Sequence, residues 1–283
     1  MAEIGMTEVT AASSAAIATL IQETLRQKAK LLPTVSDYSS WAGKGVKSVS
    51  VPRASKFSAA DKAENSALTS QELTLSVDTI SLNKHKAVYT ALEKIANMQS
   101  APDMVAKIVD DMSAELALQL DKDIITELKD VSSSGPDHLL DYADSSGDSL
   151  ARVEFSNARK LLRKQNVNME DGNLYCLTSP EQEENLLNIS AFVEADKYGS
   201  RESILSGEIG RVFGFKIIIH SEMAATDAVF YHKSHVGVAI GQAEFKRDES
   251  LSKVADEFLL HQVYGAETLQ GKVAGVYFNG SGS

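Results

Sequence analysis

The sequence predicts an α+β protein with one long helix, one long hairpin and a lobe of mixed helices and strands. Three observations predict it. Large apolar residues recur every three or four positions over residues 102–129, the spacing of one face of an α-helix. Alternating apolar residues in 46–51 and 72–82 flank a long polar stretch, a pattern typical of a hairpin. Helix-like and strand-like segments then follow one another after residue 136.

The composition is that of a globular protein, with 43% hydrophobic and 24% charged residues in a chain of 283. The formal net charge is -11, which makes the chain as a whole a poor nucleic-acid binder. The charge is uneven, because residues 1–60 hold 7 basic and 4 acidic residues and the remainder 21 and 35. The amino-terminal part is therefore mildly basic and the body strongly acidic.

Cysteine content and hydropathy exclude several classes of protein. The single cysteine, Cys176, excludes an internal disulfide framework and a cysteine zinc cluster. Its apolar neighbours predict a buried strand thiol with no catalytic role. No signal peptide is evident and no apolar run reaches the length of a membrane span, so we expect no membrane partner.

The first 45 residues are predicted to form an arm. An amphipathic helix over residues 10–30 ends before Pro33, and basic residues in its last turn suit the helix dipole. Trp41 and a flexible Ala-Gly-Lys-Gly run follow. The arm has too little apolar surface to form a core alone. It is either a disordered tail or an arm that packs on something else.

Residues 46–90 are predicted to form a hairpin with a long polar tip, in which Phe57 and Leu68 are the large apolar residues. A change of alternation near Asp78 and Thr79 predicts a bulge. Such a hairpin is not stable in isolation. It is either a surface insertion or an element that lies on a neighbouring subunit.

The helix over 102–129 has one apolar face and would be about 40 Å long. It is either a mechanical spine or the core helix of an enzyme. Further elements are predicted as a helix over 149–165, a strand over 174–177, a helix from Ser179 to about 187, and strands over 215–220, 228–231, 236–240 and within 245–278.

Residues that could carry chemistry form no specific motif. The candidate groups are Gly207, Gly210 and Gly214; His220, Glu222, His232 and His235; and Asp141, Asp144 and Asp148. The glycine spacing is neither a dinucleotide nor a phosphate motif, the histidines lack an HExxH pattern, and the aspartates lack calcium-loop spacing. We therefore predict no catalytic site, no metal site and no cofactor.

The order of these parts resembles that of the major capsid proteins of tailed phages, which share the Hong Kong 97-type fold. Local sequence carries the resemblance in LLRKQNV at 161–167, LTSPE at 177–181, GEIGRVFGFKIIIHS at 207–221 and VYG at 263–265. In that family's axial domain a helix, a strand ending in Ser/Thr-Pro and an IGxxxGFxVxxS segment follow one another. The resemblance covers essentially the whole chain.

The resemblance implies a Hong Kong 97-like major capsid fold. Its parts would be an N-arm at 1–45, an extended E-loop hairpin at 46–90, a peripheral domain at 91–135 and 246–283 with the spine helix at 102–129, and an axial domain at 136–245. Some family members crosslink a hairpin lysine to a neighbour, and Lys56 and Lys62 lie in that region. The candidate inter-subunit contacts are Trp41, Arg53, Lys56, Phe57, Lys62 and Leu68.

The implied function is structural, not enzymatic. The protein would assemble in the host cytoplasm into hexamers and pentamers of an icosahedral phage head, and end in the virion. Implied partners are further copies, a separate scaffolding protein, a portal, a decoration protein and double-stranded DNA without sequence-specific contact. An encapsulin-like nanocompartment shell and an α/β enzyme with a lid hairpin remain the alternatives.

Overall fold

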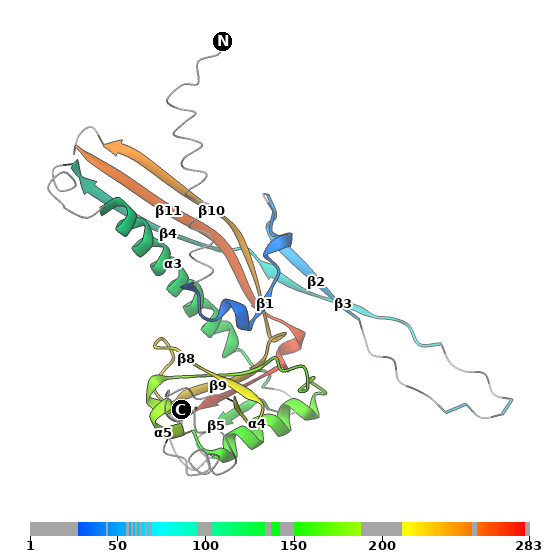
Figure 1. Ribbon diagram of the computed structural model, residues 1–283. Coiled ribbons are helices and arrows are strands. Elements are labelled where there is room, and N and C mark those ends of the chain that lie inside the picture. Colours follow the sequence, from blue (N-terminus) through cyan, green and yellow to red (C-terminus); the bar gives the residue numbers. More distant parts are fainter. Residues whose placement is uncertain are drawn as a thin grey trace.

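The computed structural model describes residues 28–43, 45–54, 57, 59, 61–62, 64–65, 67, 70–94, 104–133, 137–141, 150–187, 211–250 and 254–280. The molecule is elongated, with a sheet-and-helix body above a second lobe and a thin hairpin projecting to one side (Figure 1). Within the described residues the strands form a four-stranded sheet, a six-stranded sheet and a two-stranded ribbon.

The four-stranded sheet forms the upper body and has the strand order β1-β10-β11-β4. Its strands are β1 (Ser36–Asp37), β10 (Val236–Ser250), β11 (Ala255–Thr268) and β4 (Lys84–Glu93). β10 and β11 are antiparallel neighbours along almost their whole length, with one register shift between Ile240 and Ala243. The sheet is therefore a long, narrow platform.

Helix α3 (Met104–Leu128) lies along this platform (Figure 1). The predicted spine helix is thus confirmed within the described residues. Its buried apolar residues share one core with the sheet; they include Met112, Leu116, Leu120, Ile124 and Leu128. The same core also contains Tyr175 and Tyr231 of the lower lobe, so the carboxyl half of the spine joins the two lobes.

The six-stranded sheet forms the lower lobe, in the order β5-β12-β9-β6-β8-β7. Its strands are β5 (Leu139–Asp141), β12 (Gly275–Asn279), β9 (Asp227–His232), β6 (Leu174–Thr178), β8 (Phe215–Ile219) and β7 (Arg211–Val212). The side chains of β6 point alternately to the two faces of this sheet. Leu174 and Cys176 join the core under α4 (Arg152–Lys164) and α5 (Pro180–Leu187), whereas Tyr175 and Leu177 join the core of the spine.

The projecting ribbon pairs β2 (Ser48–Ala54) with β3 (Leu75–Ser81) in one uninterrupted antiparallel register. The predicted bulge near Asp78 and Thr79 is therefore wrong. No residue is inserted. The apolar residues switch from one face of β3 to the other because the root of the ribbon packs on the body, whereas its outer part projects away from it. Ile80 is buried at the root, whereas Leu75 points outward from the projecting part.

The sheets divide the chain differently from the predicted domain boundaries in two places. Residues 236–245 belong to β10 and lie in the four-stranded sheet, although the predicted axial domain includes them. β12 pairs with β9 and β5 in the six-stranded sheet, although the predicted peripheral domain includes it. The chain crosses between lobes through η5 (Gln270–Lys272), a short helical turn that the apolar pattern of the sequence does not mark.

Three further predictions concern the amino terminus, membranes and the cysteine. The predicted helix over residues 10–30 lies outside the described residues except for 28–30. None of the described helices has the length and apolarity needed to cross a bilayer. Cys176 is a free thiol buried in β6, as predicted, and burial raises its pKa well above the ordinary value.

His235 should make the protein less stable in acid. Burial lowers the pKa of His235 to about 4, an effect that the Leu128 carbonyl and Asp130 partly oppose and that His138 and Lys272 strengthen. In the unfolded chain this residue is protonated near pH 6.5, whereas in the folded protein it stays neutral down to about pH 4. Its protonation therefore leaves the free energy of unfolding unchanged above pH 6.5 and lowers it as the pH drops from 6.5 towards 4. At about 1.4 kcal/mol per pKa unit, the loss is about 3 kcal/mol.

Urea unfolding between pH 7 and pH 4 measures this loss. His235→Gln should flatten the dependence on pH, whatever its effect on stability at pH 7. His261→Gln is the matched control, because His261 lies on the sheet surface beside His85 and Glu244. An unchanged slope in His235→Gln would contradict the assignment.

Candidate inter-subunit surfaces

The ribbon of β2 and β3 carries a row of exposed apolar side chains. Leu75 and Val77 of β3, together with Leu73 just before it, occupy alternate positions and are 62%, 56% and 52% exposed. Phe57, in the loop beyond the ribbon, is 64% exposed. The ribbon projects away from the body, where no described part of the chain covers it (Figure 1). Exposed apolar residues gathered in a row typically mark a contact surface.

The root of the ribbon, in contrast, is firmly attached. Ile80 and Val49 are buried in a small core with Ala42, Ala239 and Leu269. This core joins the ribbon to the amino-terminal segment and to the strands of the four-stranded sheet. The base of the ribbon is therefore fixed to the body, which suits the ribbon to carry a contact surface away from it.

The crossing of the ribbon over β11 depends on a glycine. A Cβ atom on Gly265 would lie 2.3 Å from the carbonyl oxygen of Ser81 and 2.8 Å from its carbonyl carbon. Both atoms belong to backbone, so no side-chain rotation could relieve the overlap. Only glycine lets the two chains approach this closely.

Gly265→Ala should shift the root of the ribbon and lower the free energy of unfolding by about 1–3 kcal/mol, as overpacking commonly does. Urea unfolding measures this change. Gly43→Ala is the matched control, because a Cβ atom there meets nothing within 4 Å. Equal stability of the two variants would contradict the close crossing.

Polar contacts also fix the root. The backbone N–H of Gln270 in η5 donates to Asp78 at 3.0 Å, and the Arg53 guanidinium lies 4.0 Å from the same carboxylate. Gln270, Gly271 and Lys272 all have positive φ, which makes η5 a tight left-handed turn. Lys272 in turn pairs with Asp130 just beyond the spine at 2.6 Å. The ribbon root, the spine end and the crossover between lobes thus meet at one turn.

The predicted contact residues lie in two separate places. Arg53 lies near the outer end of β2, opposite Ser76, although its guanidinium reaches back towards Asp78. Trp41 is 59% exposed in η2 (Ser39–Trp41), with its ring 6.0 Å from that of Tyr38. Phe57 and Lys62 are exposed in the loop beyond the ribbon. Lys56 and Leu68 lie outside the described residues.

The row of Leu73, Leu75 and Val77 is absent from the predicted contact residues. Its alternation is visible in the sequence, but alternation alone does not tell an inward face from an outward one.

The segment before β2 runs along the four-stranded sheet. Its short helix η1 (Leu32–Thr34) is followed by β1, which pairs in parallel with β10, and the Tyr38 N–H donates to the Val238 carbonyl at 2.7 Å. The Ile240 N–H donates to the Ser39 hydroxyl at 3.0 Å. The described part of the arm therefore packs on its own subunit.

Asp121 of the spine joins three parts of the chain. Its carboxylate accepts hydrogen bonds from the backbone N–H groups of Lys30, at 3.0 Å, and Leu31, at 3.2 Å. His220 of the lower lobe lies 3.4 Å away through Nε2, and both side chains are almost fully buried. Nearby, Lys129 pairs with Asp227 at 2.6 Å. These contacts fix the spine to both the arm and the lower lobe.

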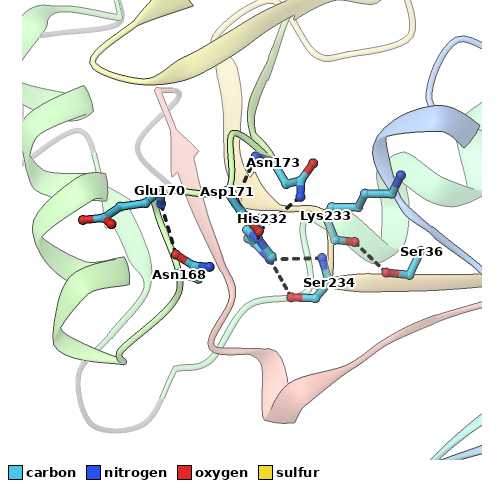
Figure 2. A network of polar contacts seen from close by, with 8 residues as sticks. All are labelled: Ser36, Asn168, Glu170, Asp171, Asn173, His232, Lys233 and Ser234. Atoms are coloured by element: carbon cyan, nitrogen blue, oxygen red, sulfur yellow. Dashed lines mark hydrogen bonds and ion pairs between the residues drawn. The ribbon is translucent and has the colours of Figure 1, made fainter.

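The four residues considered as a metal set are not brought together. His220 contacts Asp121, and His235 is buried next to Gly275. His232 lies in a surface network with Asp171 at 2.8 Å and Ser234 at 2.6 Å (Figure 2). Glu222 pairs with Lys122 at 3.2 Å. Within the described residues, no group of three or more potential ligands converges on one point.

The network in Figure 2 fastens the turn before β6 to the turn after β9. Burial opposes ionisation of Asp171, but hydrogen bonds from His232 and Asn173 lower its pKa to about 2. The Ser36 hydroxyl donates to the Lys233 carbonyl at 3.1 Å, which ties β1 to the same turn. The network therefore links the arm to the lower lobe through hydrogen bonds.

The remaining candidate residues have little described structure. Gly214 takes a positive φ in the turn between β7 and β8, as the glycine-rich pattern suggests, while Gly207 and Gly210 lie outside the described residues. Asp141 ends β5, and Asp144 and Asp148 lie outside.

Comparison with known proteins agrees with this architecture. A family model described as "Phage capsid protein" matches residues 11–273. A search of curated proteins found no match.

Solved phage structures have the same fold. A structure of Mycobacterium phage Che8 is 19% identical with a TM-score of 0.67, covering 88% of this chain and 90% of that one. The capsid of cyanophage P-SCSP1u is 16% identical with a TM-score of 0.70, covering 88% and 87%. The capsid of cyanophage Pam1 is 13% identical with a TM-score of 0.72, covering 90% and 93%.

Proposed function

Since this chain belongs to the phage capsid protein family, we propose that it builds the hexamers and pentamers of an icosahedral phage head that encloses double-stranded DNA. It is a structural major capsid protein, not an enzyme. The observation that supports the assembly proposal is the ribbon of β2 and β3, which projects from the body with Leu75 and Val77 exposed. Copies of the chain would cover this row.

The proposed roles of the segments follow the sheets. Residues 1–45 act as the N-arm and 46–90 as the E-loop, which lies on the next subunit. The peripheral domain comprises α3 and the four-stranded sheet, and the axial domain comprises the six-stranded sheet with α4 and α5. On this proposal the axial domain would include β12, and the second part of the peripheral domain would begin at Val236 instead of at residue 246, in keeping with the strand order of the two sheets.

The energetics favour assembly through many modest contacts. Covering a large apolar side chain stabilises a complex by roughly 1.5–3 kcal/mol, so the exposed row supplies several kcal/mol for each ribbon. Closed rotational symmetry then repeats the contact around each ring. The acidic body would limit nonspecific binding to packaged DNA, which the protein encloses without reading its sequence.

Other partners belong to the same proposal. A scaffolding protein, a portal and a decoration protein would assist assembly in the host cytoplasm, and the finished subunits would reside in the virion. The alternative function is that of an encapsulin-like shell protein, but the match to the phage capsid family favours the phage head. The enzyme alternative has no support from the site geometry.

Electron microscopy of negatively stained protein tests this proposal. The full chain is expressed alone and together with the scaffolding protein of its phage. Rings or shells are expected in at least one of the two preparations. A compact monomer under all conditions would contradict the proposal, and a shell that copurifies with protein cargo instead of DNA would favour the encapsulin-like alternative.

A further inference from the structure

The last turn of α4 presents a basic surface on an otherwise acidic protein. Arg163 and Lys164 are exposed there, and Lys160 is exposed immediately before this turn. Within the described part of the chain none of them has an ion-pair partner, although the structure contains many such pairs elsewhere. No acidic side chain among the described residues therefore neutralises this surface.

Three of the described charges near this surface have partners within the subunit. Arg159 donates to the Phe213 carbonyl at 3.0 Å, and Glu154 is buried, where it accepts the Ala151 N–H at 2.8 Å. Asp171, in the turn that follows α4, is held by His232 at 2.8 Å. Of the described acids in that turn, Glu170 alone is exposed without an ion pair, and one carboxylate cannot neutralise three cations.

Helix α5 presents the opposite charge. Glu181 and Glu184 are exposed and Glu183 is half-buried, and none of the three pairs with a cation in the described chain. The Leu150 N–H donates to the Gln182 side chain at 2.7 Å, so α5 is fixed beside the first turn of α4. Because α4 has 13 residues, its basic last turn lies about 20 Å from its beginning.

The two surfaces therefore occupy opposite ends of one layer. Both helices pack on the same face of the six-stranded sheet, since Phe155 of α4 and Leu186 of α5 share one core. In Figure 1, α5 lies at one side of the lower lobe and α4 extends to the other. A subunit built this way can meet an identical subunit head to tail, which is the geometry of a rotationally symmetric ring.

We propose that the acidic surface of α5 in one subunit faces the basic last turn of α4 in the next subunit around a capsomer. The occupant of each surface is a second copy of this chain. Complementary charge would steer subunits into the correct neighbour relation and disfavour a flipped one, in which like charges meet. This inference rests on the proposed capsid function and specifies which axial surfaces pair.

Charge reversal and charge exchange test the pairing. The variants are K160E/K164E, E181K/E184K and the exchanged chain that carries all four substitutions. Each double variant should raise the subunit concentration needed for rings or shells by about tenfold or more at 0.1 M salt, because like charges then face each other. The exchanged chain should recover most of this loss, since it restores opposite charges with the original net charge.

A matched control separates the pairing from a general effect of charge. K107E/K246E changes the net charge by the same amount on exposed residues of the upper body and should assemble like the wild type. Thermal unfolding of each isolated subunit shows whether the variants still fold.

The outcomes distinguish this inference from the proposed function. If the wild type itself forms no ring or shell, the proposed function fails. If the wild type assembles and both double variants assemble equally well, the pairing alone is overturned. It is also overturned if the exchanged chain remains as defective as the double variants, or if K160E/K164E impairs only DNA retention.

Discussion

Replacing Leu75 and Val77 by aspartate should abolish shell formation and leave the isolated subunit folded. Both side chains are exposed on the ribbon, so the substitutions should change subunit stability by no more than about 0.5 kcal/mol. In the assembled state the variant loses two buried apolar side chains, worth roughly 1.5–3 kcal/mol each. It also has to bury two carboxylates.

The combined penalty exceeds about 3 kcal/mol per ribbon, which corresponds to at least a hundredfold weaker association. Sedimentation velocity and electron microscopy measure assembly, and thermal unfolding measures the fold. The conservative variant L75V/V77I keeps the apolar row and should assemble normally. Shells of L75D/V77D at wild-type yield would show that the row is not an inter-subunit contact.

Asp121→Ala should have the largest effect on subunit stability, a loss of about 3–5 kcal/mol. The aspartate is buried and accepts two backbone hydrogen bonds, from Lys30 and Leu31, next to His220. Its removal leaves the buried Leu31 N–H without its acceptor, loses the part-buried bond from Lys30 and removes the polar partner of the buried His220 ring, which costs more than the bonds themselves contribute. The arm and the lower lobe should both loosen from the spine.

Urea unfolding measures the loss, with Asp110→Ala as the control on the same helix. Asp110 pairs with Lys28 at 2.6 Å but is well exposed, so its removal should cost less than about 1 kcal/mol. If the two variants were equally stable, Asp121 would not be the junction described above.

Local patterns predicted most of the elements because their causes are local. The three- and four-residue spacing of apolar residues is a property of the helix itself, and it gave the spine to within two residues of α3. The cap formed by Ser179 and Pro180 likewise marked the start of α5.

Features that depend on long-range contacts could not be predicted from the sequence. Asp121 and His220 are 99 positions apart, and nothing in either neighbourhood indicates the other. The β12 strand has the same apolar character wherever it pairs, so its place in the six-stranded sheet was not evident.

The sequence predicted a projecting element with exposed apolar residues, and its contact with neighbouring copies stays a prediction. A long hairpin with too little core indicated a contact element, and Phe57 and Trp41 are indeed exposed. The exposure of Leu73, Leu75 and Val77 could not be predicted, because the same alternation describes a buried face and an exposed one. Only the position of the ribbon, clear of the body, distinguishes them (Figure 1).

Hydroxyl-radical footprinting of the ribbon, read by mass spectrometry, tests most directly whether neighbouring copies cover it. Isolated subunits and assembled particles of the same chain are oxidised in parallel, and labelling at Phe57, Leu75 and Val77 is compared with that at Tyr89, exposed on the four-stranded sheet. We expect the three ribbon residues to be labelled strongly in the subunit and protected several-fold in the particle. Equal labelling of the ribbon in subunit and particle would contradict the account.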